Sequence, residues 1–421
     1  MAGDHAAIGD GIPTVDRHWL NEERVRVYSW MIVVMFGIGA AIWSALSLPD
    51  LVDPRGKPVG YDFIAFWSAA RLALQGRPEA AYDWQSIAAV HRTAVPALSS
   101  GIIFAWHYPP TFLLVVWPLA LFSYPLALGI WVLSTAGMWA GLIRQIAADR
   151  RAWIVAASAP AGLINLLDGQ NAFLTAGLAG FALILLARRP VAAGILIGLL
   201  AIKPHLAVLF PLALLAECQW RAMAAAALTA ALFAAVSVAA FGWGTAAAFL
   251  HDLPASRALI DHGTVPWDAM PSPYVFALSL GASVVAAEVL QGIAALFAAA
   301  CVYRVWRNRD APFEAKAATL LAGSLLVSPF LFTYDLTWAA LAAGWLALLG
   351  LRTGFRRGER EILLFAWLAP MLMPPVQVLT GVQVGFPALL LLLVVAVCRA
   401  APASRLGREA VTGAHPFADP R

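Results

Sequence analysis

The sequence predicts an all-α integral membrane protein that crosses the bilayer many times. Of its 421 residues, 61% are hydrophobic and only 12% are charged, and the mean hydropathy is +0.76. Soluble domains carry about 25% charged residues, and they cannot hide this much apolar surface because much of any folded chain stays at its surface. The 17 tryptophans suit the headgroup interface of a bilayer.

The basic balance of the chain does not indicate a nucleic-acid partner. The net charge is +4 and the isoelectric point is about 9.1, but the basic residues gather in short clusters between apolar runs, as cytoplasmic loops do. No RNA- or DNA-binding pattern is present. The cysteines Cys218, Cys301 and Cys398 have no CxxC spacing, which predicts neither a disulfide framework nor a metal site.

The first 28 residues are polar and include Arg17, Arg24 and Arg26. The uncharged run that follows, residues 30–49, is longer and later in the chain than the apolar region of a signal peptide. It predicts a retained first helix, with residues 1–28 as a cytoplasmic N-terminal segment.

The arginine clusters set the expected orientation of the remaining chain. They occur at 144–151, 188–189, 304–316, 352–360 and 399–408, and the positive-inside rule places them in the cytoplasm. The connections about 48–110 and 244–283 then become outer loops, the first unusually long. We expect a membrane domain over 29–398 and a cytoplasmic, disordered tail over 399–421, which lacks a periodic apolar face.

Several apolar runs are shorter than the about 20 residues that a full span needs. Residues 153–166, 172–187, 191–202 and 206–216 therefore predict half-helices or tilted hairpins that line a cavity, because broken backbone at membrane depth must be buried or wet. Residues 111–147 fit either one or two crossings, so the expected total is about 11–13 membrane helices. No internal repeat of the transporter kind is visible.

Residues 63–74 follow the first helix and have helical apolar spacing at Phe63, Phe66, Trp67 and Ala70. They predict an amphipathic helix lying in the membrane plane. Asp62 stands at its N-cap position, where it either caps the helix or serves a site.

His107 lies in an aromatic and proline-rich stretch before the next apolar run. It could bind a phosphate or a hydroxyl, or it could be an interfacial histidine with its ring at the headgroup level.

Four ionisable residues interrupt otherwise apolar sequence. A lone charge in the bilayer is costly, so such residues usually face a cavity and either pair or act. Lys203, beside Pro204 and His205, would suit a lipid-linked phosphate or would be a simple loop lysine. Asp335 is either a helix cap or a cavity acid, and Glu288 is expected to mark a helix end. The fourth is Asp168.

No P-loop, GxGxxG, HExxH, GxSxG or EF-hand pattern occurs in this sequence. This argues against nucleotide hydrolysis and against zinc catalysis. We therefore expect no cofactor, and we expect the energy of any reaction to come with the substrate.

Ten short motifs follow one another in a fixed order over about residues 60–340. They are Asp62-Phe63, Phe66-Trp67, Ala69-Ala70, Gly76, Ala81-Tyr82-Asp83, Tyr108-Pro109-Pro110, Pro118-Leu119, Gly169-Gln170-Asn171, the stretch 193–198 followed by Lys203-Pro204, and Ser328-Pro329 near Tyr334-Asp335. By their order and spacing they resemble glycosyltransferase family 87, a family of enzymes with the GT-C fold that use polyprenol-phosphate sugars.

The resemblance implies a chemistry and a set of roles. Asp62 would be the general base that takes the proton of an acceptor hydroxyl, and direct transfer would invert the anomeric centre. The leaving phosphate would meet a positive charge from Lys203, His107 or Arg71, in that order. The other expected substrate-binding residues are Gln170, Asn171, Tyr334 and Asp335.

The implied partners are a polyprenyl-phosphate-linked sugar, a lipid or glycan acceptor, and membrane lipids. The sugar would be mannose, and the site would lie on the outer side of the cell (inner) membrane. The sequence departs from the family where Tyr334-Asp335 stands in place of an expected histidine, which leaves the sugar preference open.

Two other classes of protein also fit the composition. A transporter or lipid flippase would use the same intramembrane charges, but it would more often show repeat symmetry and shorter outer loops. A non-catalytic membrane scaffold would tolerate substitution around Asp62.

Overall fold

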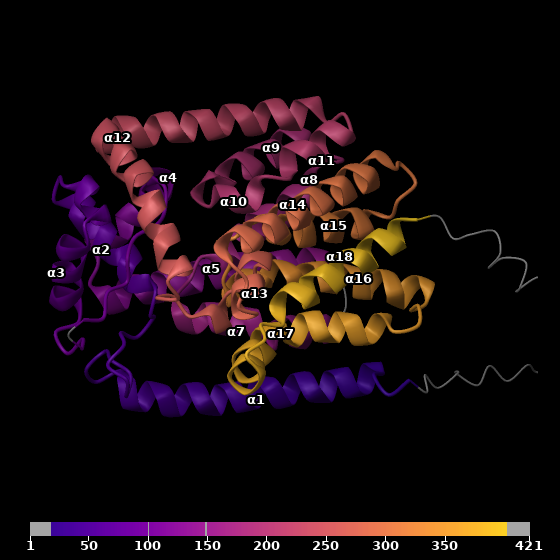
Figure 1. Cartoon of the computed structure of the whole chain (residues 1–421), viewed down its shortest axis with the longest axis horizontal. Coiled ribbons are helices and arrows are strands. Elements are labelled where there is room, and N and C mark those ends of the chain that lie inside the picture. Colours follow the sequence, from indigo (N-terminus) through magenta and orange to yellow (C-terminus); the bar gives the residue numbers. More distant parts are fainter. Residues whose placement is uncertain (1–17, 100, 148–149, 402–421) are drawn as a thin grey trace, which may run out of the picture.

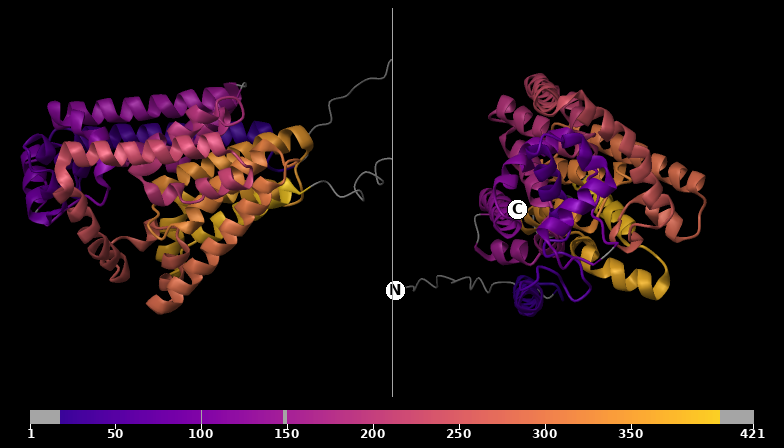
Figure 2. Two further views of the ribbon diagram at one scale, coloured as in Figure 1. Left: turned by 90° about the horizontal axis from the view of Figure 1, so that it is seen from above. Right: turned by 90° about the vertical axis from the view of Figure 1, so that its left-hand side faces the viewer.

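The computed structural model describes residues 18–99, 101–147 and 150–401 (Figure 1). Apart from one isolated β-bridge between Val52 and Pro58, the regular structure of these residues is helical. The expected disordered tail falls almost wholly outside them. Most helices run lengthwise between two ends of the molecule (Figures 1 and 2). We call one the Asp62 end and the other the arginine-rich end.

Among the described residues, six helices are long and apolar enough to cross a membrane alone. The polytopic all-α prediction is therefore confirmed, while the expected 11–13 spans would need the shorter helices as well. The first helix starts earlier than the apolar run, at Glu22, because Asn21 caps it by accepting from the backbone N–H of Arg24 at 3.0 Å. The six are α1 (Glu22–Ser47), α5 (Tyr124–Ile146), α12 (Trp220–Asp261), α14 (Val284–Arg307), α16 (Thr337–Thr353, extended to Thr333 by η5) and α17 (Glu359–Thr380).

Broken or short helices make the other passes, as the short apolar runs predicted. Prolines begin many of these helices, because a backbone N–H in the first turn of a helix has no partner within the helix. Each of them is too short to span the bilayer alone. They are α6 (Arg150–Ala157), α7 (Pro160–Asp168), α8 (Ala172–Leu185), α9 (Pro190–Leu199) with η3 (Leu200–Ile202), α10 (Pro204–Ala207), α11 (Phe210–Ala216), α15 (Phe313–Val327) and α18 (Gly385–Ala400).

The first outer segment folds into a small helical unit at the Asp62 end (Figure 1, left). It contains α2 (Phe63–Leu74), η1 (Pro78–Tyr82) and α3 (Trp84–Ala94). The bounds of α2 are those predicted, but the expectation of a helix lying on the membrane surface is wrong. Phe63, Phe66, Trp67 and Ala70 are all buried, and so are five of the other eight residues of α2, since the rest of the unit and α4 pack around it.

The ambiguous stretch after this unit crosses the bundle once. Helices α4 (Pro110–Val116) and η2 (Trp117–Leu121) stay at the Asp62 end, because Ala120 accepts from the guanidinium of Arg71 at 3.0 Å and Phe122 accepts from the indole of Trp67 at 3.1 Å. Only α5 then runs to the other end.

The second outer segment is largely helical. Gly242, with φ 80° and ψ 159°, breaks α12 into a membrane rod and an outer arm, and this positive φ suits glycine alone. The arm turns over the Asp62 end (Figure 1) and packs on η1, where Phe249 meets Tyr82 at 6.1 Å between ring centroids. Helices η4 (Trp267–Ala269) and α13 (Pro273–Ser279) follow.

Ion pairs join several helices at the arginine-rich end. Arg399 pairs with the buried Glu359, and Lys316 pairs with Glu217 at 2.6 Å. Both described ends of the chain lie here, since the indole of Trp19 donates to Glu361 at 3.0 Å on α17.

Candidate active site

Asp62 stands at the N-cap position of α2, but its side chain makes no capping hydrogen bond. Instead its Oδ2 accepts from the amide Nε2 of Gln170 at 2.8 Å. The capping alternative therefore does not account for this carboxylate. Its oxygens are directed away from the helix that it precedes and toward the corner between α7 and α8.

Gln170 is held so that its NH₂ group faces Asp62. Its Oε1 accepts from the hydroxyl of Tyr108 at 3.0 Å and from the backbone N–H of Asn171 at 3.1 Å, which fixes the amide orientation. A chain of hydrogen bonds thus runs from Tyr108 through Gln170 to Asp62. Asp62 and Tyr108 come from the two ends of the first outer segment, and Gln170 comes from the corner between α7 and α8. Three separate stretches of sequence therefore meet here.

Gly169 makes this meeting possible. It ends α7 in a left-handed conformation, with φ 58°, and a Cβ on it would lie 2.7 Å from Cβ of Phe63 and 3.1 Å from the carbonyl of Gly60. Only glycine combines this turn with so close an approach. The start of α2 therefore lies directly against the corner that carries Gln170.

The surroundings of Asp62 change its acidity. Burial raises the pKa of its carboxyl above the ordinary value, against the hydrogen bond from Gln170 and the positive charges of Lys203 and Lys57, which lower it. A carboxylate with a raised pKa is a stronger base than a solvated one, and this is the tuning that general-base catalysis needs.

Lys203 lies on the other side of this cluster and is already paired. Its Nζ donates to Oδ1 of Asp335 at 2.6 Å, and the two side chains are 5% and 0% exposed. The ammonium also lies over the ring of Tyr334, 4.9 Å from its centroid. Asp335 accepts a further bond from the backbone N–H of Phe332 at 3.2 Å. The ammonium is thus held in a buried site by an ion pair and by an aromatic ring.

Two polar groups beside this cluster lack protein partners. Asn171 is fully buried, and its amide makes no hydrogen bond of ordinary geometry among the described residues, although it lies close to the hydroxyl of Tyr108. The Nε2 of His205, two residues after Lys203, is also buried and unpaired. Buried groups of this kind are rare and costly, so they are suited to meet a polar substrate.

His107 belongs to a second polar cluster, whose other two members lie on the outer arm of α12. Its Nδ1 lies 2.8 Å from Oδ2 of Asp252 and 2.7 Å from the hydroxyl of Ser256, which itself donates to Asp252 at 2.9 Å. The imidazole side chain is 32% exposed. With Nδ1 engaged, Nε2 is the ring atom left to meet a ligand.

Arg71 lies apart from both clusters. It is eight residues after Phe63 along α2, about 12 Å at 1.5 Å per residue, and its guanidinium bonds Ala120 and stacks on Trp67 at 5.4 Å. Glu288, expected at a helix end, lies near the start of α14 and pairs with Arg257 at 2.7 Å.

Sequence reasoning gave no role to Lys57 and Tyr108. The charge of Lys57 acts on the Asp62 carboxylate, and Tyr108 orients Gln170. Neither interrupts an apolar run, so no pattern of charge in hydrophobic sequence could identify them. Among the described residues, no group of three or more His, Cys, Asp or Glu side chains is placed to hold a metal ion.

The comparisons with known proteins agree with the motif pattern. The family model described as glycosyltransferase family 87 matches residues 106–329. The matched range contains His107, Gln170, Asn171 and Lys203, whereas Asp62 lies before it. No curated protein and no solved structure matches the chain significantly.

Proposed function

The chain belongs to glycosyltransferase family 87, so it is a membrane glycosyltransferase, and we propose that it moves a sugar from a polyprenyl-phosphate donor to a lipid or glycan acceptor. The observation that carries this proposal is the pairing of Asp62 with Gln170 beside the buried Lys203–Asp335 ion pair. A base and a held positive charge are the two groups that such a transfer needs.

In the proposed reaction, Asp62 takes the proton of the acceptor hydroxyl as the hydroxyl oxygen bonds to the anomeric carbon. The bond between that carbon and the donor phosphate oxygen breaks, and the phosphate leaves with the electron pair. Attack from the face opposite the leaving group inverts the anomeric centre. The positive charge of Lys203 stabilises the phosphate as its charge grows.

Asp335 and Tyr334 act through Lys203 in this proposal. They hold the ammonium in place inside a buried site. The proposal does not use Arg71, because this residue lies in the last turn of α2, at the opposite end of that helix from Asp62.

Asn171 and His107 would bind the sugar and the acceptor. The unpartnered amide of Asn171 can both donate to and accept from sugar hydroxyls. The exposed ring of His107, held by Asp252, would meet the acceptor from the α12 arm. Mannose is the sugar that the family resemblance favours. The site would face the outer side of the cell membrane, because the arginine clusters gather at the opposite end.

The test is transfer from radiolabelled polyprenyl-phosphate-mannose in proteoliposomes. Wild type would be compared with Asp62→Asn and with Asp83→Asn, a matched control because Asp83 caps α3 in the same outer unit. We expect product from wild type and the control, and a loss of at least about 100-fold in Asp62→Asn, the usual size of a general-base contribution. Equal activity of wild type and Asp62→Asn would remove Asp62 from catalysis.

A second donor series separates the enzyme from the transporter alternative. If wild type is inactive with mannose, other polyprenyl-phosphate sugars would be tried. Inactivity with all of them, together with movement of labelled lipid across the proteoliposome bilayer, would contradict the proposed transfer.

A further inference from the structure

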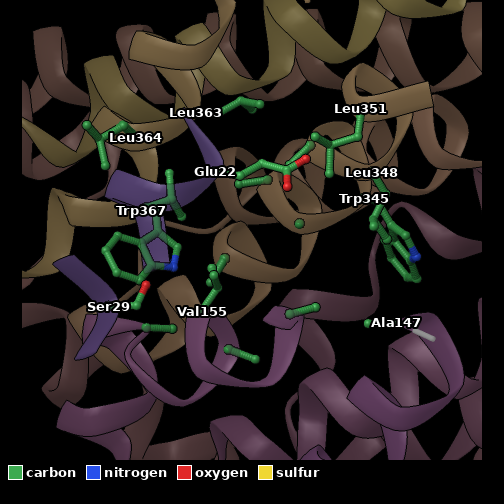
Figure 3. A pocket seen from close by; sticks show the side chains of 18 of the residues that line it. Glu22, Ser29, Ala147, Val155, Trp345, Leu348, Leu351, Leu363, Leu364 and Trp367 are labelled. Carbon is green, nitrogen blue, oxygen red and sulfur yellow. The ribbon is translucent and has the colours of Figure 1, made fainter. Parts of the chain in front are cut away.

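Helix α1 stands at the edge of the bundle, and a cavity of about 360 Å³ lies between its first turns and the helices behind it (Figure 3). The end-on view in Figure 2 (right) shows α1 apart from the main group of helices. This volume falls within the range of small-molecule pockets. The cavity is at the arginine-rich end, since Glu22, Val25 and Arg26 line it, whereas Asp62 follows the far end of α1.

The walls of the cavity are apolar. Side chains from α6, α16 and α17 surround the space in Figure 3. The residues of α1 that line the cavity are mainly polar or charged, apart from Val25. The apolar wall residues on the other three helices are Val155, Leu348, Leu351, Leu363, Leu364 and Trp367. Such a surface would be covered by hydrocarbon rather than by water in a bilayer.

The rim of the cavity carries more positive than negative charge. Arg26 and Arg360 line it together with Glu22, and the Arg360 guanidinium is placed by bonds to the carbonyl of Leu20 at 2.9 Å and by the ring of Phe355 at 4.5 Å. Guanidinium groups are the preferred binders of phosphate. An apolar space under a basic rim fits a molecule with a hydrocarbon chain and an anionic head.

We propose that the cavity holds an acyl chain of an anionic phospholipid, with its phosphate at Arg26 and Arg360. The lipid comes from the leaflet at the arginine-rich end, because both rim arginines lie there. Its chain supplies the packing that α1 lacks, since among the other helices α1 makes extensive contact only with α6. This binding is independent of the transfer reaction at Asp62.

The donor tail is a less suitable occupant. Helix α1 has 26 residues, about 39 Å at 1.5 Å per residue, and it separates the cavity from Asp62. A donor whose phosphate lies at the Asp62 end would not use the arginines at the rim of the cavity. A phospholipid uses both the apolar wall and the charged rim.

Gly344 offers a variant that fills the space. It lines the cavity, and a Cβ on it would meet nothing within 4 Å. The leucine of Gly344→Leu would therefore extend into the cavity without a clash at its Cβ. Gly292 is a matched control, because it also lies inside a helix, has the same open space, and does not line the cavity.

The experiment is native mass spectrometry of each full-length protein purified in mild detergent. We expect wild type and Gly292→Leu to retain one phospholipid, enriched in anionic heads, and Gly344→Leu to lose it at least about ten-fold. Arg26→Gln should keep the lipid but lose the preference for anionic heads. A retained lipid that is polyprenyl phosphate, or equal retention by Gly344→Leu, would overturn the proposal.

A second measurement covers the case in which detergent strips the lipid. Proteins would be placed in phosphatidylcholine vesicles that contain phosphatidylglycerol with brominated acyl chains, which quench nearby tryptophans. Trp139, Trp345 and Trp367 all line the cavity, so we expect a quenched component in wild type that is smaller in Trp367→Phe and absent in Gly344→Leu. If Gly344→Leu is quenched as strongly as wild type, no acyl chain occupies the cavity.

Discussion

The amide Nε2 of Gln170 donates to Oδ2 of Asp62 at 2.8 Å across a sequence separation of 108 residues. This one bond joins the first outer unit to the corner between α7 and α8. It also stabilises the ionised carboxylate of Asp62, so it links the fold to the acidity of the proposed base.

The pH dependence of transfer should report this bond. Burial raises the pKa of Asp62 above its ordinary value of 3.8, and the base acts only when ionised. The rate kcat/KM should therefore fall as the pH falls through the raised pKa. In Gln170→Ala the hydrogen bond that lowers this pKa is gone, so the acidic limb should move to higher pH.

The measurement is a pH–rate profile of wild type beside Gln170→Ala, with the Tyr108→Phe variant as a control that loosens Gln170 but leaves its NH₂ group present. An acidic limb that does not move in Gln170→Ala would mean that Asp62 is not the group that titrates.

The Lys203–Asp335 pair should separate stability from activity. Lys203→Met leaves a buried carboxylate unpaired, which typically costs about 3–5 kcal/mol, and should lower the thermal midpoint in detergent. The double variant Lys203→Met/Asp335→Leu removes both charges and should regain most of that stability. It should still lack transfer activity, because the charge that meets the phosphate is missing.

Thermal unfolding and transfer assays on the single and double variants check this. Recovery of activity in the double variant would assign Lys203 and Asp335 a purely structural role.

His107 should influence the acceptor rather than the donor. Loss of a hydrogen bond to a polar group costs about 1–3 kcal/mol, so His107→Phe should raise the acceptor KM roughly ten-fold or more while the donor KM stays unchanged. Ser256→Ala keeps the contact of His107 with Asp252 and should have a smaller effect. Steady-state kinetics with donor and acceptor varied in turn will measure both KM values. A change confined to the donor KM would contradict the assignment of His107 to the acceptor.

Gly169 should be far less tolerant than another glycine of similar backbone conformation. Gly169→Ala places a Cβ 2.7 Å from Phe63, whereas Gly76, with φ 75°, has open space around it. Gly76→Ala should cost about 1 kcal/mol through backbone strain alone. Gly169→Ala should cost more and should reduce transfer, because Gln170 and Asp62 move apart. Similar losses in both variants would show that the close approach does not matter.

Much of the fold could be predicted because the bilayer makes composition informative. The bounds of α2 follow from apolar spacing at Phe63 and Phe66, and the broken passes follow from short runs between prolines. The environment of α2 could not be predicted, since a helix that packs on protein and one that lies on lipid share the same apolar face. For the same reason, the apolar pattern of residues 111–147 could not show that α4 and η2 stay at the Asp62 end.

The candidate site was predictable where a charge interrupts apolar sequence, as at Lys203 and Asp335. The site was not predictable where a residue's hydrogen-bond partner lies far along the chain and is of a residue type that is common in that stretch. Asp252 is 145 residues from His107, and it belongs to a stretch with several other acidic residues. Only the bend at Gly242 brings it back over the Asp62 end.

The Lys203–Asp335 pair has a consequence for biogenesis. The two residues are 132 positions apart, and chains are made and inserted from the N-terminus onward. Until the segment with Asp335 arrives, Lys203 lacks the carboxylate with which it forms its ion pair, and an unpaired ammonium in hydrocarbon costs about 2.5–3.5 kcal/mol at the centre of a helix. The nascent protein must therefore keep Lys203 at the water boundary during most of its synthesis, and a truncated chain would carry an unpaired charge where the complete one has its buried ion pair.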